Sequence, residues 1–166
     1  MNKVFFIYEL FDVTGTRTTK LDELAEIGPG PYPYVTTQST NNGVAGKYNT
    51  YTEEGNVLVM DSAVLGFCSY QEENFTASDH VEKLKPKFEM NKFIGLYIAT
   101  VINANQYRFC YGRKANQGQI NNLKISLPID ENEEPDWKAM EQYIKSIWNE
   151  VADEIIKDVR LTKIKK

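Results

Sequence analysis

The sequence predicts a mixed α/β (α+β) fold: one domain with a twisted mixed β-sheet and few helices, followed by a long C-terminal amphipathic helix. Three observations lead to this prediction. Short apolar runs bounded by turn residues recur along the chain, as they do in strands. One longer run, NKFIGLYIATVINAN at 91–105, has the length and apolar content of a mostly buried helix. From Trp137 onward, apolar residues recur at helical spacing.

The strands are predicted from runs rich in β-branched and aromatic residues. The first two pieces, VFFIY and LFDVTG, are short and lie close together. The helix of residues 91–105 separates the last strand from the others. The further predicted strands are residues 32–38, 56–62, 66–71, 80–86 and 123–129.

Two local signals lie between these runs. TTKLDELAEIG at 18–28 predicts a short helix with Thr18 or Thr19 as N-cap and Gly28 as its end, with acidic residues in its first turns. NNG at 41–43 predicts a turn, because Asn and Gly tolerate the positive φ that tight turns require.

The C-terminal helix is predicted to begin after the acidic stretch DENEEPD, which makes residues 1–129 one domain and residues 130–166 a spacer or dimerisation helix. Pro135 and Asp136 favour a helix start. Its apolar stripe suits two arrangements equally, packing on its own domain or an intermolecular coiled coil. The stripe residues are Trp137, Met140, Ile144, Ile147, Val151 and Ile155.

The charge is unevenly distributed. Residues 1–129 contain 12 basic and 13 acidic side chains, whereas residues 130–158 contain 3 basic and 10 acidic ones. Two windows, 27–52 and 101–129, contain no acidic residue at all. A surface built from these windows would be neutral or positive and rich in hydrogen-bonding groups, which suits phosphates and base edges.

The size and the cysteines complete the general picture. With 166 residues, 42% of them hydrophobic, the chain can bury the core of one globular domain. It contains no long apolar run and no recognisable signal peptide, so we expect a cytoplasmic protein without a membrane span. Cys68 and Cys110 lie in aromatic runs typical of buried free thiols rather than of a disulfide or a metal site.

Catalytic motifs are weakly supported. The sequence has no Gly-rich phosphate loop, and its single histidine, His80, is interpreted as a structural or surface residue. PYPY at 31–34 is unlike the Asn/Asp-Pro-Pro-Tyr motif of amino-methyltransferases, because Gly30 stands where the amine-binding side chain is needed. A small metal-dependent nuclease that uses Asp61, Glu72 and Glu73 remains an alternative.

Several motifs, in this order and spacing, resemble the target recognition domain of type I restriction–modification specificity subunits and the similar domains of type IIG and IIB enzymes. They include PYPYVTTQSTNNGVAGKY, NKFIGLYIATVI, FCYGRKANQGQINNLKISLPID and PDWKAMEQYIKSI, so the resemblance covers nearly the whole chain. One departure is DSAVLG at 61–66, where many family members carry a Gly-rich turn, and it implies a differently shaped loop.

The resemblance implies a recognition domain that reads one half of a split double-stranded DNA site and a helix that docks on a DNA methyltransferase subunit, with a restriction subunit as a further partner. Catalysis and S-adenosylmethionine belong to those partners, so no cofactor or metal is expected in this chain. Specificity subunits have two recognition domains and two helices, so a chain with one of each implies a homodimer or part of a longer protein.

Candidate DNA-contacting residues follow from the resemblance and from side-chain chemistry. Neutral donors and acceptors suit base edges, with Asn or Gln matching adenine, whereas cations hold phosphates and tyrosines pack on sugars or phosphates. The simpler interpretation is a polar hairpin loop with edge-strand tyrosines, and a protein-interaction module that uses the acidic helix is a further alternative. The candidates are Tyr34, Thr36, Thr37, Gln38, Ser39, Thr40, Asn41, Asn42, Lys47, Tyr48, Tyr107, Arg108, Tyr111, Arg113 and Lys114.

Overall fold

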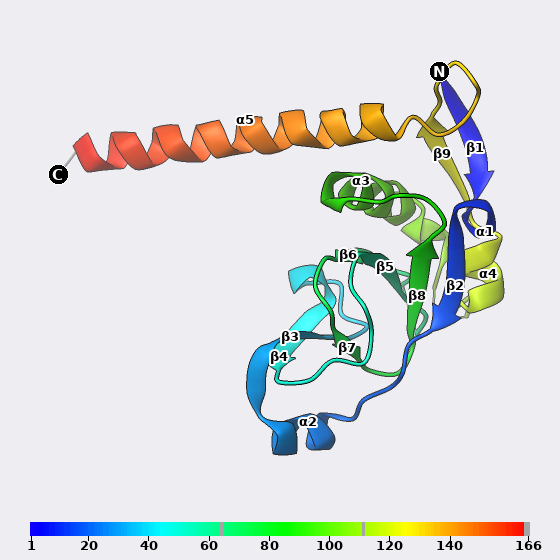
Figure 1. The fold of residues 1–166 in the computed structure, drawn as a ribbon, viewed down its shortest axis with the longest axis vertical. Helices are drawn as coiled ribbons and strands as arrows, with labels where there is room; N and C mark the ends of the chain where they lie inside the picture. The colour runs from blue at the N-terminus through cyan, green and yellow to red at the C-terminus, as the bar shows by residue number, and fades with distance from the viewer. Residues whose placement is uncertain (64, 111, 165–166) are drawn as a thin grey trace.

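The structure is a computed structural model that describes the backbone of every residue except 64, 111, 165 and 166, and side chains up to residue 157 apart from 64 and 111. The described residues form nine strands, five short helices and one buried helix, and one long helix ends the chain (Figure 1). The strands are β1 (Asn2–Phe6), β2 (Phe11–Gly15), β3 (Pro29–Val35), β4 (Val44–Tyr48), β5 (Val57–Asp61), β6 (Cys68–Gln71), β7 (Thr76–Ala77), β8 (Val81–Pro86) and β9 (Lys124–Pro128). The helices are α1 (Ile7–Leu10), α2 (Leu21–Ile27), η1 (Asn41–Gly43), α3 (Lys92–Asn103), η2 (Gln106–Arg108), α4 (Gln117–Asn121) and α5 (Trp137–Ile164).

The predicted fold class is confirmed, with the strands divided among three sheets. β1 pairs with β9, the central sheet has the order β2-β8-β5-β6, and a third sheet has the order β4-β3-β7. Most of the pairings are antiparallel, and β3 and β7 pair in parallel.

Side-chain alternation along β5 and β8 assigns the two faces of the central sheet. Leu58, Met60 and Leu84 point into the larger core, which they share with Ile98 of α3. The residues between them point the other way, into a smaller core with the third sheet that includes Val59. The central sheet therefore has hydrophobic clusters on both sides.

The buried helix forms where it was predicted. Asn91 caps α3, because its Oδ1 accepts hydrogen bonds from the backbone N–H groups of Phe93 at 3.0 Å and Ile94 at 3.1 Å. Gly95 allows α3 to lie directly on β6, since a Cβ at this position would come within 2.5 Å of the Tyr70 ring. This close contact places α3 against one face of the central sheet.

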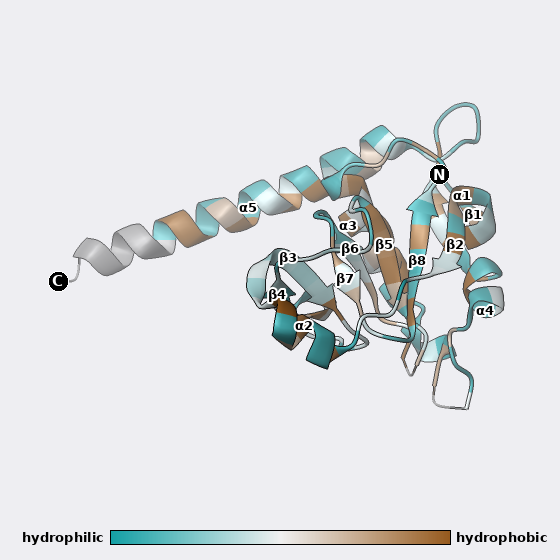
Figure 2. Ribbon diagram, turned by 60° about the horizontal axis from the view of Figure 1, so that its bottom comes forward, coloured by the Kyte–Doolittle hydropathy of each residue, from teal (hydrophilic) through white to brown (hydrophobic). Residues whose placement is uncertain are grey.

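The long helix α5 has two different parts. Trp137 stacks on Phe88 with 3.8 Å between ring centroids, and Met140 is fully buried in the larger core. Further along, Ile147, Val151 and Ile155 are exposed. Hydrophobic residues recur along α5 after it leaves the domain (Figure 2). Trp137 and Met140 were expected in a partner interface, but they pack on their own domain.

Two further expectations were wrong in detail. The N-cap of α2 is Lys20, without a side-chain cap bond, because the hydroxyl of Thr19 is instead bonded to that of Thr76 at 2.7 Å. Cys68 is buried, and burial raises the pKa of its thiol far above the usual value, but Cys110 is exposed. None of the helices that the structure describes is long and apolar enough to span a membrane.

Candidate functional site

The polar stretch that follows β3 forms a tightly bonded loop, here called the amide loop (residues 36–43). Its backbone closes through Thr36 N–H to the carbonyl of Gly43 at 2.8 Å. Asn41 and Asn42 have φ of 50° and 54°, which confirms the turn predicted at NNG. The loop is therefore closed by a backbone hydrogen bond and contains a defined turn.

Its side chains divide into two groups. The amide nitrogen of Gln38 donates to the carbonyls of Thr40 and Val44 at 3.1 and 2.9 Å, and that of Asn41 donates to Val44 at 2.8 Å. Ser39 and Thr40 are exposed at the apex, whereas Thr36 and Thr37 are half-buried. The amides hold the loop in shape, and the exposed hydroxyls lie at its tip.

Asn42 protects the edge of the central sheet. Its Nδ2 donates to the carbonyl of Tyr70 on edge strand β6 at 2.9 Å, and Gln71 Nε2 donates back to the carbonyl of Asn42 at 2.9 Å. Further along the same edge, Asn103 of α3 bonds to both backbone groups of Cys68, each at 2.8 Å. Side-chain amides thus satisfy backbone groups that an edge strand otherwise leaves unpaired.

We expect Asn42→Ala to lower the free energy of unfolding by about 2 kcal/mol, because it leaves a strand carbonyl unpaired and places Ala at positive φ. Asn42→Gly should cost about 1 kcal/mol, since Gly tolerates that backbone conformation. Urea denaturation measures both values, with Ser39→Ala as the exposed control within about 0.5 kcal/mol of the wild type. Equal costs for all three variants would contradict the role given to Asn42.

Tyr34, Tyr48 and Lys47 each have a partner within the fold. Tyr34 is buried, donates its hydroxyl to the carbonyl of Thr19 at 3.2 Å, and meets the ring of Tyr48 edge-on at 6.0 Å. Burial raises the pKa of the Tyr34 phenol, with a smaller contribution from the Asp79 charge. Lys47 lies 3.5 Å from a carboxylate oxygen of Glu73. Tyr34 therefore belongs to the core.

A second group of candidates surrounds η2 and α4. Arg108 and Arg113 line one hollow together with the amides of Gln119 and Asn122, and Arg108 also lines a neighbouring hollow with Lys124. We call these five residues the basic hollow. Tyr107 is 74% exposed at its rim, and Lys114 is exposed nearby in the sequence, whereas Tyr111 lies outside the described residues.

The amide loop and the basic hollow are separate. The loop bonds to Tyr70 and Gln71, at the end of β6. Phe109, next to Arg108, contacts Gly66 in the loop that enters β6, since a Cβ on Gly66 would lie 2.6 Å from its ring. The amide loop and Phe109 thus lie near opposite ends of β6, a strand about 10 Å long.

The three carboxylates of the nuclease alternative do not converge. Asp61, at the turn end of β5, accepts hydrogen bonds from the backbone N–H groups of Ala63 at 2.7 Å and Leu65 at 2.9 Å. Glu72 lies at the other end of the β5–β6 hairpin and pairs with Lys92 at 3.1 Å. Within the described part of the chain, no group of three or more His, Cys, Asp or Glu residues is arranged to hold a metal ion.

Comparison with known proteins identifies the family. The family described as "Type I restriction modification DNA specificity domain" matches residues 2–157. The chain belongs to this family. A curated relative is the specificity subunit S.BcgI of a type II restriction enzyme from Heyndrickxia coagulans, 32% identical over 155 residues, which represent 89% of this chain and 43% of that protein.

Solved structures of specificity subunits have the same fold. The S subunit of a type I restriction-modification system from M. genitalium matches with a TM-score of 0.64 and 16% identity, over 97% of this chain and 42% of that one. The HsdS subunit from Thermoanaerobacter tengcongensis matches with a TM-score of 0.62 and 10% identity, over 92% and 38%. This specificity domain thus spans less than half the length of the relatives it matches.

Two features of the specificity domain were missed in the sequence. Gln119 and Asn122 of α4 share the basic hollow, but their short helix lacks a strong periodic signal. Trp148 of α5 lies beside Lys92, whose Nζ is 5.2 Å from its ring centroid, and both line a groove that reaches Asn42 and Lys47. The absence of carboxylates from residues 101–129 was the signal that could have drawn attention to α4.

Proposed function

We propose that this chain recognises a specific sequence in double-stranded DNA and directs a partner DNA methyltransferase, and with it a restriction subunit, to that sequence. The proposal assigns catalysis and S-adenosylmethionine to the partners. It rests on membership of the specificity-domain family and on one structural observation, the basic hollow. Two guanidinium groups and a lysine surround exposed amides there, in a segment without a carboxylate.

The chemistry of the two clusters supports different roles in DNA binding. Cations bind phosphates of any sequence, and they position the protein on the duplex. Exposed hydroxyls and amides on a rigid loop suit base edges, which carry the sequence information. We therefore assign phosphate binding to the basic hollow with Lys114, and base reading to the amide loop.

Replacing Arg113 and Lys114 together by Ala should weaken binding about tenfold to every DNA duplex, because phosphate contacts carry no sequence information. The slope of log affinity against log salt should become less steep by about 1.8, since each phosphate contact contributes about 0.9. Fluorescence anisotropy at several salt concentrations measures both quantities, and Lys138→Ala/Lys157→Ala on exposed positions of α5 is the matched control.

Other outcomes of this experiment identify the alternatives. Loss of intact DNA in the presence of Mg²⁺ would favour a nuclease. A protein-interaction module would show no salt-dependent binding to DNA. If the control pair flattened the salt slope as much as Arg113 and Lys114 do, the phosphate-binding surface would lie elsewhere.

We further propose that the exposed part of α5 associates with another helix, either in a second copy of the chain or in a partner subunit. Ile144, Ile147, Trp148, Val151 and Ile155 line a nearly continuous apolar surface. Its length beyond the domain, seen in Figures 1 and 2, supports association, because monomeric proteins rarely expose a contiguous apolar row. In a homodimer, two recognition domains would read a split palindromic site.

A further inference from the structure

The amide loop contains two side chains that donate to the same carbonyl. Gln38 Nε2 lies 2.9 Å from the oxygen of Val44 and 3.1 Å from that of Thr40, and Asn41 Nδ2 lies 2.8 Å from the oxygen of Val44. A carbonyl oxygen only accepts hydrogen bonds, so the nitrogen of each amide must face inward. The amide oxygens of Gln38 and Asn41 are therefore the groups left for other partners.

The two amides differ in how many donors remain. A primary amide has two N–H groups. Gln38 donates both of its N–H groups, one to the carbonyl of Thr40 and one to that of Val44. Asn41 donates one N–H group to the carbonyl of Val44 and keeps the other for a further partner. A two-bond contact with adenine requires an acceptor for N6 and a donor for N7, so Asn41 retains this capacity and Gln38 has lost it.

We propose that Gln38 is a base-reading residue that acts only as an acceptor and takes an N–H from the exocyclic amine of adenine or cytosine in the major groove. This inference rests on the proposed function of DNA recognition and specifies its chemistry. Adenine N6 and cytosine N4 are the amine donors of the major groove, whereas guanine and thymine present acceptors there that would face the Gln38 oxygen unfavourably.

The bonding inside the loop keeps Gln38 in this state. To donate to a base, its amide would have to release the carbonyl of Thr40 or Val44. Thr40 is also bonded through its carbonyl to the N–H of Gly43 at 3.0 Å, so the amide of Gln38 and the η1 turn share one acceptor. Releasing it exchanges one hydrogen bond for another and adds the cost of reshaping the loop, so the acceptor-only state is favoured.

The test uses the full chain and modified DNA. A preferred duplex is first selected from a randomised pool, and each adenine or cytosine in it is then replaced by purine or 2-pyrimidinone, which lack the amine. At one position, we expect the wild type to lose affinity about three- to tenfold, the effect of one hydrogen bond. In Gln38→Ala, removing the amine at that position should not lower the affinity for the duplex any further.

A second analogue separates the acceptor-only contact from the two-bond contact. Where the base is adenine, 7-deazaadenine keeps the amine and lacks N7, so it should change the affinity of the wild type by less than about twofold at that position. Because each ratio is measured within one protein, a general weakening of Gln38→Ala does not affect the result. Gln142→Ala, at an exposed position of α5, is the matched control and should keep the wild-type pattern.

Two results would overturn the inference while DNA recognition stands. One is a 7-deazaadenine loss as large as the amine loss, which disappears in Gln38→Ala and indicates a two-bond contact. The other is that no amine in the duplex couples to Gln38. Failure to select any preferred duplex would instead overturn the proposed function.

Discussion

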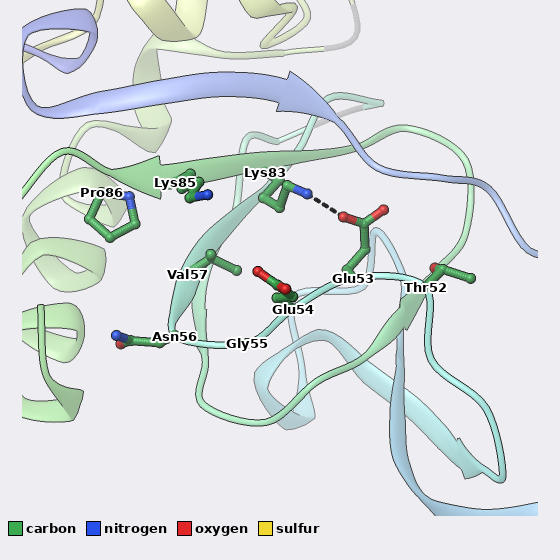
Figure 3. A pocket seen from close by; sticks show the side chains of 9 residues that line it. All are labelled: Thr52, Glu53, Glu54, Gly55, Asn56, Val57, Lys83, Lys85 and Pro86. Atoms are coloured by element: carbon green, nitrogen blue, oxygen red, sulfur yellow. Dashed lines mark hydrogen bonds and ion pairs between the residues drawn. The ribbon is translucent and has the colours of Figure 1, made fainter.

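Glu53→Ala is expected to lower the free energy of unfolding by about 3 kcal/mol. The Glu53 side chain is 6% exposed, accepts a hydrogen bond from the backbone N–H of Arg17 at 2.7 Å and pairs with Lys83 (Figure 3). Removing the carboxylate leaves the Lys83 ammonium, itself 23% exposed, without its partner in a partly buried site. The expected loss in the free energy of unfolding lies at the lower end of the values typical of broken buried ion pairs, because Lys83 retains some access to water.

The neighbouring residue supplies the control. Glu54 lines a pocket together with Glu53 and Lys83 but is itself exposed, so Glu54→Ala should change the stability by less than about 0.5 kcal/mol (Figure 3). Urea denaturation of both variants gives the comparison. Similar losses for Glu53→Ala and Glu54→Ala would show that the pair with Lys83 does not stabilise the fold.

The double variant Ile147→Asp/Val151→Asp is expected to weaken association of the chain at least about hundredfold. Both side chains are exposed on the apolar surface of α5, so the new carboxylates leave the domain fold unchanged but would be buried in any helix pair. Burying an unpaired charge costs several kcal/mol, which exceeds the roughly 2.7 kcal/mol that correspond to a hundredfold change. Light scattering at tens of micromolar should show a dimer for the wild type and a monomer for the variant.

A charge-matched control separates burial from repulsion. Gln142→Asp/Asn149→Asp adds the same two charges at exposed positions off the apolar row. It should remain dimeric, apart from a modest effect of the extra negative charge. A monomeric wild type would contradict the homodimer and favour a partner subunit as the occupant of α5.

If two copies of α5 associate, we expect them to pair in antiparallel orientation, for an electrostatic reason. Residues 130–158 contain ten acidic and three basic side chains, whereas the last eight residues of the chain contain four basic and no acidic ones. Two such helices repel each other in parallel, and in antiparallel orientation the basic end of one lies near the acidic start of the other. The same orientation fits the twofold symmetry of closed dimers.

The spacing of apolar residues and the turn-forming residues were sufficient to predict most of the longer helices and strands. The apolar runs predicted β5, β6, β8, β9 and α3, because strand and helix periods depend only on neighbouring residues. The long helix and the NNG turn were predicted for the same reason. β4, β7 and α4 were missed, since they are short and owe their conformation to their partners in the fold.

The roles of the candidate site residues depend on contacts with residues distant in the sequence, which no local sequence pattern predicts. Gln38, Asn41 and Asn42 have equivalent amides in the sequence, yet the fold gives two, one and one of their N–H groups to backbone carbonyls. Tyr34 and Met140 follow patterns that also occur at surfaces, but long-range packing buries them. Asp61 is committed to the loop that follows β5.

By itself, the sequence determined the fold class, the long C-terminal helix, the uneven charge and the family to which the chain belongs, because these depend on composition, spacing and order along the chain. Only the tertiary structure decided which polar groups are satisfied internally and which face outward. A hydrogen bond between Asn42 and Tyr70 joins residues 28 positions apart, and such pairings follow from the packing of the sheets and helices rather than from any local signal.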